Sequence, residues 1–239
     1  MSVVVPFYDE QDNVDPLIAE IVTAMGASAY EIVAVDDGSR DGTGARLAHL
    51  AARLPQLRVV RHARNRGQSA ALCSGADAAR GDWLATVDGH GQNEPADIPP
   101  LVARARQEPA QPALLCGHRR RRRDSVLRRL SSRIANGVRA RLLGDATPDT
   151  GCGLKLMRRR AFLRLPRFDH MHRFLPALVL RDGGVVESVP VAHRPRLHGR
   201  SKYGVWNRLG VGVVDLAGVM WLQRRALRAP TDRDPDDET

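Results

Sequence analysis

Two adjacent carboxylates are the first residues that could do chemistry. Asp36 and Asp37 close an apolar run and are followed by Gly38 and Ser39. Carboxylates at a strand end can accept hydrogen bonds from a base N–H and from ribose hydroxyls, and glycine permits a tight turn. The segment Val35–Thr43 therefore predicts a nucleoside site, although a plain strand–turn–helix junction would use the same residues.

A second acidic segment combines residues that could hold a metal. Asp88 is followed by Gly-His-Gly-Gln, so His90 and Gln92 come at alternate positions after the carboxylate. Oxygen ligands suit Mg²⁺ and Mn²⁺, and the intervening glycines leave room for a diphosphate. The pattern predicts a divalent metal beside a diphosphate, with a simple turn as the alternative.

Arginines give the chain its charge. The formal net charge is +10, and only two of the 37 basic residues are lysines. Ten arginines lie between His118 and Arg141, whereas residues 231–239 carry five acids. Such uneven charge indicates an anionic partner: nucleic acid, a membrane surface or a phosphorylated substrate. A solvated basic surface is the alternative for residues 117–124.

Composition excludes several classes of protein. With 239 residues, 43% hydrophobic and 27% charged, the chain is not disordered throughout. We expect no membrane-spanning helix and no signal peptide, because the apolar runs are too short. Cys73, Cys116 and Cys152 are far apart and form no metal or disulfide pattern, which favours a reducing, cytoplasmic location. Aromatic residues make up only 4%, which disfavours nucleic-acid binding.

Alternating strand and helix patterns must position these side chains. We predict strands at 2–5, 31–36, 57–61, 83–88 and 113–116, and helices at 14–25, 42–54, 68–80 and 97–107. This order implies a parallel sheet, whose ligands bind at the carboxyl ends of the strands, where the acidic segments lie. Further on, we predict a basic amphipathic helix at 125–143, a helix at 171–180, a strand at 185–191 and an apolar helix at 205–222.

Seven segments, in this order, resemble the family 2 glycosyltransferases with a GT-A fold. The closer resemblance is to the branch that glycosylates polyprenyl phosphates, the dolichyl-phosphate mannose synthase type. The segments are Val3–Asn13, Val35–Thr43, Asn65–Leu72, Val87–Pro99, Asp149–Arg159, Met171–Leu178 and His193–Gly204.

The resemblance implies an α/β fold: a Rossmann-like, mostly parallel sheet flanked by helices, with C-terminal interfacial amphipathic helices. It also implies a single catalytic domain over 1–225, with a nucleotide-sugar half (1–115), an acceptor half (116–204) and an interfacial helix (205–225). Residues 226–239 are expected to be a disordered acidic tail.

The resemblance also assigns roles to individual residues. The residues implied in nucleotide-sugar binding are Pro6, Tyr8, Glu10, Asp36, Asp37, Asp88, Ser201 and Lys202. The implied metal ligands are Asp88, His90 and Gln92, and the implied acceptor-phosphate ligands are Arg119, Arg122 and Arg133. The implied catalytic residues are Asp88, Asp149, Arg196 and Lys202.

His90 departs from the family pattern, because it stands where the second aspartate of a D-x-D motif would be. Imidazole is a poorer partner for Mg²⁺ than for Mn²⁺, so we expect Mn²⁺ to be favoured. Two other interpretations remain open. The metal site is weakened, with arginine and lysine sharing the diphosphate charge, or the chain is a catalytically silent nucleotide-sugar-binding protein.

The implied reaction is the inverting transfer of a hexose from a nucleotide sugar to a polyprenyl phosphate. GDP-mannose is the first expectation for the donor, and a UDP-linked glucose or modified pentose is the alternative. A phosphate acceptor is already ionised near neutral pH, so catalysis needs positioning and charge stabilisation more than a general base. The basic and apolar helices predict peripheral attachment to the cytoplasmic face of a membrane.

Overall fold

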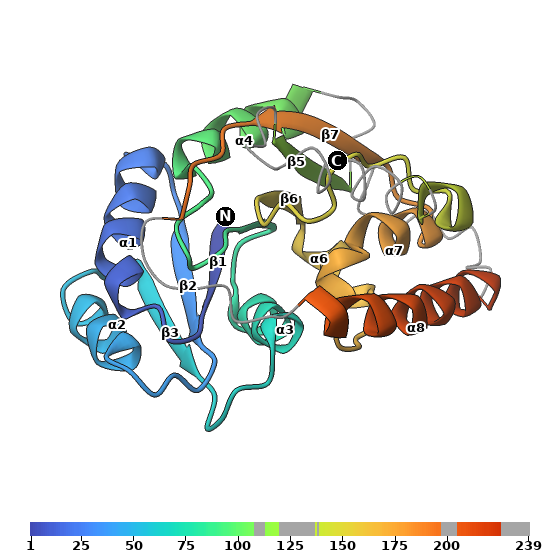
Figure 1. Cartoon of the computed structure of the whole chain (residues 1–239). Helices are drawn as coiled ribbons and strands as arrows, with labels where there is room; N and C mark the ends of the chain where they lie inside the picture. Colours follow the sequence, from blue (N-terminus) through green and yellow to red (C-terminus); the bar gives the residue numbers. More distant parts are fainter. Residues whose placement is uncertain (108–112, 120–136, 138, 197–204, 226–239) are drawn as a thin grey trace.

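The computed structural model describes residues 1–107, 113–119, 137, 139–196 and 205–225. Within these ranges the strands are β1 Ser2–Phe7, β2 Glu31–Asp36, β3 Leu57–Arg61, β4 Trp83–Thr86, β5 Leu114–Arg119, β6 Lys155–Arg158 and β7 Val186–Val191. They form one curved sheet in the order β3-β2-β1-β4-β6-β5-β7 (Figure 1). The strands β1 to β4 pair in parallel, as the sequence predicts, and β7 is parallel to β5. In contrast, β6 is antiparallel to both β4 and β5.

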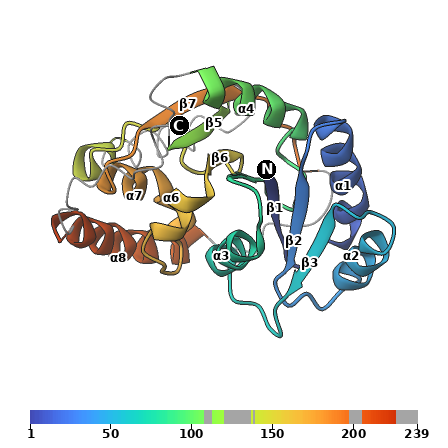
Figure 2. The same cartoon turned by 180° about the vertical axis from the view of Figure 1, so that it is seen from behind.

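Helices cover both faces of this sheet (Figures 1 and 2). The helices on one face are α1 Gln11–Met25, α2 Thr43–Ala51 and α4 Ile98–Gln107. Those on the other face are α3 Gln68–Ala78, α6 Arg159–Arg164, α7 Leu175–Arg181 and α8 Val205–Arg224. The described residues also form two short 3₁₀ helices, η1 Pro95–Asp97 and η2 Met171–Arg173. The fold is thus the flanked, mostly parallel α/β sheet that the sequence predicts.

The first strand shows how the sequence builds this layered core. Val3 and Val5 pack into the cluster beneath α1 and α4, whereas Val4 packs into the cluster beneath α3. All three are essentially inaccessible to solvent. A strand that is buried on both faces needs a continuous apolar run, and this is what the N-terminus provides.

The structure differs from the predicted elements at several boundaries. β4 ends at Thr86, two residues earlier than predicted, so Asp88 lies in a turn beyond the sheet. The predicted helix 171–180 is divided into η2 and α7, and Pro176 lies in the first turn of α7. Proline fits this position, because a residue in the first turn needs no backbone N–H for the helical hydrogen bonds. The short helix α6 was not predicted.

Part of the predicted helix at 125–143 can be compared with the structure. Residues 137 and 139–143 are helical, while the rest of that segment lies outside the described residues. The predicted tail at 226–239 also lies outside them.

Candidate functional site

The Asp37 carboxylate organises the loop that follows β3. Its Oδ1 lies 2.6 Å from His62 Nδ1 and accepts a hydrogen bond from the Arg66 backbone N–H at 2.9 Å. Its Oδ2 accepts hydrogen bonds from Asn65 Nδ2 at 3.0 Å and from the Gly67 backbone N–H at 2.9 Å. The structure thus places Asp37 behind the wall of the predicted nucleoside site, where it fixes the shape of that wall.

The neighbouring Asp36 is fully buried at the end of β2. Its Oδ1 accepts a hydrogen bond from the Ser39 backbone N–H at 2.9 Å, which closes the turn into α2. Its Oδ2 has no hydrogen-bond partner among the described residues and lies 3.4 Å from Arg61 Nε. Asp36 therefore supports the turn and presents one oxygen to an arginine of the adjoining pocket.

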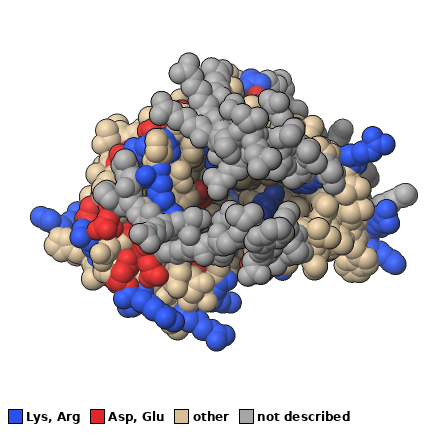
Figure 3. Space-filling model, in the orientation of Figure 1, with Lys and Arg blue, Asp and Glu red and all other residues tan. Residues whose placement is uncertain are grey.

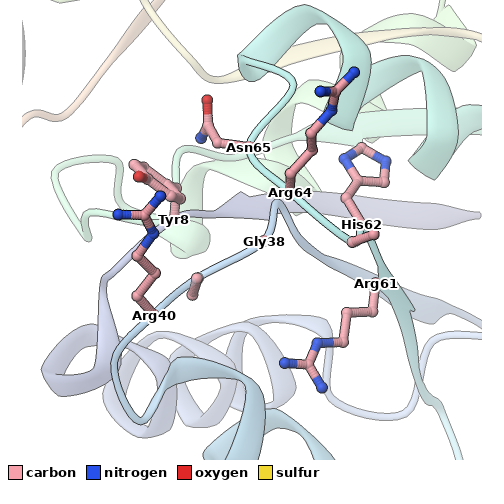
Figure 4. A pocket seen from close by; sticks show the side chains of 9 residues that line it. Tyr8, Gly38, Arg40, Arg61, His62, Arg64 and Asn65 are labelled. Atoms are coloured by element: carbon pink, nitrogen blue, oxygen red, sulfur yellow. The ribbon is translucent and has the colours of Figure 1, made fainter.

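A pocket of about 540 Å³ lies between these two loops and is called the donor pocket here (Figure 4). Gly38 forms its floor with φ +72°, and an added Cβ would lie 2.6 Å from the Asn65 nitrogen, so only glycine allows the loops to meet. In Figure 4, Tyr8 and Arg40 lie on one side of the pocket, and Arg61 and Arg64 on the other. The lining residues are Tyr8, Gly38, Ser39, Arg40, Arg61, His62, Ala63, Arg64 and Asn65.

The donor pocket is rich in hydrogen-bond donors, and none of the described residues that line it is acidic. On the face seen in Figure 3, acidic side chains gather in the region of α1 and α2, and basic side chains project at the left, lower and right-hand edges. The pocket thus suits a ligand with several acceptor oxygens.

Glu10 joins the start of α1 to two distant segments. Its backbone N–H donates a hydrogen bond to Thr43 Oγ1 at 2.9 Å. Its carboxylate accepts hydrogen bonds from Asn13 Nδ2 at 2.6 Å and from the Arg196 guanidinium. The structure therefore brings together Glu10 and Arg196, two of the predicted site residues. Ser201 and Lys202, which the sequence places in the same loop as Arg196, lie outside the described residues.

Asp88 lies in the turn after β4 and is held from three directions. Its Oδ1 accepts a hydrogen bond from Gln68 Nε2 at 2.8 Å, and its backbone N–H donates one to Asn93 Oδ1 at 3.0 Å. Its Oδ2 lies 3.4 Å from His90 Nε2. A Cβ added to Gly153 would overlap the Asp88 carboxylate, so the backbone of the Gly-rich loop lies directly against it. The contact explains the glycine at position 153.

The Asp88 carboxylate is stabilised in its charged form. Burial alone would raise its pKa, but the adjacent His90 and the charge of Lys155 outweigh this effect. The pKa of Asp88 is therefore below its usual value, and the group is available as an anion at neutral pH.

The residues predicted to bind metal fit such an ion in part. Asp88 and His90 are adjacent, and the buried His90 Nδ1 has no hydrogen-bond partner among the described residues. Gln92 Nε2 instead points to the Arg194 carbonyl oxygen, 3.5 Å away. Within the described residues, no group of three or more histidine, cysteine or acidic side chains could hold a metal. One carboxylate and one imidazole suit a metal whose remaining ligands come from a bound substrate.

A second pocket of about 380 Å³ opens beside Asp88 and is called the reaction pocket here. It lies where β4 and β6 pair, and the packing of Gly89 against the Pro6 carbonyl keeps the Asp88 turn at the end of β1. Several polar and charged side chains line this pocket, among them those of Gln68, Asp88, His90, Arg119, Lys155, His172 and Arg173.

Arg119 and Asp149 form a bidentate ion pair at the wall of the reaction pocket. Arg119 Nε and one terminal nitrogen donate to the two carboxylate oxygens at 2.6 and 2.7 Å. Both side chains are largely buried, with exposed fractions of 14% and 5%. Burial lowers the pKa of Arg119, but the hydrogen-bonded Asp149 raises it further, so this arginine stays charged. The predicted acceptor residues Arg122 and Arg133 lie outside the described residues.

Arg194 is a residue at the site that sequence reasoning missed. Its guanidinium bonds the Gly91 carbonyl oxygen and forms a bidentate pair with Glu20 of α1, with one N–O distance of 2.9 Å. Its backbone N–H donates to the Gln92 carbonyl oxygen at 3.1 Å. Arg194 therefore fixes the turn that contains the predicted metal ligand His90. Its contact with Glu20 joins residues 174 positions apart, and no local pattern in the sequence reveals it.

α8 presents an apolar face to solvent. Val213, Val214 and Trp221 are 67%, 71% and 61% exposed, and Ala217 lies between them on the same helical face. On the opposite side, Val219 is fully buried in the core. No helix in the described part of the chain is long and apolar enough to span a bilayer.

Several known proteins are similar to this chain in sequence. The family described as glycosyl transferase family 2 matches residues 2–165. The chain is 38% identical over 237 residues to dodecaprenyl-phosphate galacturonate synthase of Rhizobium johnstonii, covering 95% of this chain and 68% of that protein. It is 36% identical over 209 residues to undecaprenyl-phosphate 4-deoxy-4-formamido-L-arabinose transferase of Edwardsiella ictaluri, covering 86% and 63%. The chain thus spans about two thirds of the length of these relatives.

A similar fold occurs among solved structures. Glucosyl-3-phosphoglycerate synthase from Mycobacterium tuberculosis, in complex with UDP, has a TM-score of 0.70 and 18% identity, covering 93% of this chain and 79% of that chain. The same enzyme has been solved with Mn²⁺ and UDP, with a TM-score of 0.69, and with Mg²⁺ and UDP, with a TM-score of 0.67. At this identity the likeness shows the fold alone.

Proposed function

The chain belongs to glycosyl transferase family 2, and on that premise we propose that it transfers a sugar from a UDP-sugar to a polyprenyl phosphate. The observation that carries the proposal is the placement of two pockets at neighbouring strand ends, one rich in donors and one holding Asp88. The relatives named above act on polyprenyl phosphates, which supports the acceptor class.

The lining of the donor pocket favours uracil over guanine. Uracil presents two carbonyl acceptors and one N–H, whereas the pairing edge of guanine presents donors that need acceptors such as carboxylates. The pocket offers Arg40, Arg64 and Asn65, and no carboxylate lines it in the part of the chain that the structure describes. GDP-mannose, the first expectation from the sequence, has no support from the relatives, whose names give galacturonate and formamido-arabinose. A UDP-sugar is the better proposal.

In the reaction pocket, Asp88 and His90 would hold a divalent metal, which would compensate charge on the departing diphosphate. Imidazole supports the proposal that Mn²⁺ is preferred over Mg²⁺. Gln68 orients the Asp88 carboxylate through its 2.8 Å hydrogen bond, and Arg194 holds the turn that carries both ligands. The structural relative was solved with each of these ions, so the preference has to be measured.

The chemistry would be a displacement at the anomeric carbon. An oxygen of the acceptor phosphate forms the new bond, the bond to the UDP oxygen breaks, and the configuration inverts. No proton has to be removed from an ionised phosphate, so positioning and charge stabilisation suffice. Arg119, held by Asp149, would contact the acceptor phosphate, and Arg196, held by Glu10, would face the donor. The predicted Arg122, Arg133, Ser201 and Lys202 would complete these two groups.

The apolar face of α8 would bring the pocket to the lipid. Its exposed valines and Trp221 suit the boundary between headgroups and acyl chains, and the exposed Arg224 and Arg225 suit anionic headgroups.

We expect Val214→Asp to reduce binding to anionic vesicles in a flotation assay. Val185→Asp is the matched control, because Val185 is also exposed, at 54%, but lies beside β7. Equal vesicle binding by both variants would exclude α8 as the docking face.

The transfer itself is tested with radiolabelled UDP-galacturonate, UDP-glucose and GDP-mannose, undecaprenyl phosphate in detergent, and Mn²⁺, Mg²⁺ or EDTA. We expect label from a UDP-sugar in the lipid phase, most with Mn²⁺, and its loss in Asp88→Asn. Asp82→Asn is the control, because Asp82 is exposed and outside both pockets. Saturable donor binding without product would favour the silent binding protein that His90 suggests. Absence of donor binding would overturn the assignment of the pockets.

A further inference from the structure

Among the described residues, Lys155 is a buried cation without an ion-pair partner. Its side chain leaves β6 and is only 4% exposed. The ammonium donates hydrogen bonds to the backbone carbonyl oxygens of Thr150, at 3.2 Å, and Cys152. Among the described residues, no carboxylate lies within ion-pair distance of it. Lysine is almost never buried this deeply unless it is paired, because desolvating an unpaired charge is costly.

The other charges of the reaction pocket compensate the lysine only in part, because Asp88 acts on it from beyond ion-pair distance. Arg119 is neutralised by its bidentate pair with Asp149. Asp88, the only acidic residue among the described residues of the lining, is engaged by Gln68 and His90. An ammonium has three N–H donors, and the two carbonyls account for two of them. The pocket is therefore prepared for an additional negative charge.

We propose that Lys155 contacts an oxyanion of a substrate bound in the reaction pocket. The proposal rests on the transferase function above and adds a binding residue to it. Two sources offer the same chemistry: the phosphate of the lipid acceptor, and a carboxylate on the donor sugar, as in a uronic acid. The competing explanation is that Lys155 only holds the carbonyls of the Gly-rich loop.

The kinetic test compares Lys155→Met with the wild-type chain. Methionine keeps much of the length of the lysine side chain and removes its charge and donors. The control is Arg46→Met, which also removes one positive charge but lies on the exposed surface of α2. KM and kcat are measured for undecaprenyl phosphate with UDP-galacturonate and with UDP-galactose, a donor pair that differs in the carboxylate. A charge-assisted hydrogen bond predicts about a tenfold to hundredfold effect.

Each source of the oxyanion gives its own result. A rise in the KM of the lipid phosphate with both donors assigns Lys155 to the acceptor. A loss of preference for the uronate, with no change in the KM of the lipid phosphate, assigns it to the donor sugar. A lower melting temperature and an equal fall in kcat with both donors, with every KM unchanged, would leave the lysine a structural role and overturn the proposal.

A second measurement uses the wild-type chain and stays informative if the variant fails to fold. Because the chain has only two lysines, [ε-¹³C]lysine labelling gives two NMR signals, and Lys202→Arg identifies the signal of Lys155. The signal is followed during titration with inorganic phosphate, UDP-galacturonate and UDP-galactose. A saturable shift with phosphate or selectively with the uronate supports the proposal, and its absence with all three contradicts it. If the wild type forms no lipid product but this signal shifts, the transferase assignment fails and the oxyanion contact stands.

Discussion

The contact between Gly153 and Asp88 gives the sharpest prediction about the reaction pocket. A Cβ at position 153 would lie closer than 3.0 Å to all three atoms of the Asp88 carboxyl group, a separation that real Cβ atoms essentially never show. The Gly153→Ala variant must therefore move the carboxylate or the loop by about 1 Å, and a misplacement of that size can lower a rate by about a hundredfold. We expect kcat/KM for lipid-linked sugar formation to fall by about this factor.

The matched control lies two residues away in the same loop. A Cβ at position 151 would meet Arg119 at 3.4 Å, which is close to ordinary contact, so Gly151→Ala should keep most of the activity. Binding of Mn²⁺ is measured separately by electron paramagnetic resonance, because displacement of Asp88 should weaken it without any turnover. If Gly153→Ala binds Mn²⁺ and turns over like the control, Asp88 does not act where we place it.

Three further predictions concern neighbouring residues. His90→Asp should raise the activity with Mg²⁺ relative to Mn²⁺ in the transfer assay, and an unchanged metal preference would show that His90 is not a ligand. Asp149→Asn should lower the free energy of unfolding in urea by about 3–5 kcal/mol, because it leaves the buried Arg119 unpaired; a loss below about 1 kcal/mol would contradict this. Burial lowers the pKa of His172 from 6.5 to about 3, so the folded chain keeps it neutral while the unfolded chain takes up a proton below pH 6.5. Stability should therefore fall as the pH is lowered from 6.5 towards 3, and His172→Gln should flatten that fall; an unchanged pH slope would exclude His172 as its source.

The strands of the first half could be predicted because they are buried on both faces. Residues such as Val4 and Val33 leave no polar position in the run, so the pattern predicts a strand that is buried in a parallel sheet. The place of β6 between β4 and β5 could not be predicted, because hydrogen bonds between distant strands leave no local periodicity. The division of the helix near Pro176 did have a signal, since proline marks a first turn.

The structure brings together some of the residues that the motifs single out. Asp88 and His90 lie side by side in one turn, and Glu10 meets Arg196, a contact across 186 positions that the sequence did not predict. The burial of Lys155 could not be predicted, because nothing in a sequence tells which of two lysines is enclosed by a pocket. The structure also gives Asp37 a supporting place behind the donor pocket, because four donors from one loop converge on it.

That convergence on Asp37 has a thermodynamic consequence. The carboxylate acts as a built-in ligand for the 62–67 segment, so the segment is already folded when a nucleotide arrives. Ordering a loop on binding costs conformational entropy and slows association, and neither cost applies to a wall that is assembled in advance. We therefore expect a nucleotide to bind to a preformed site. The heat-capacity change of binding should then reflect the surface that the nucleotide buries, without a contribution from the folding of a loop.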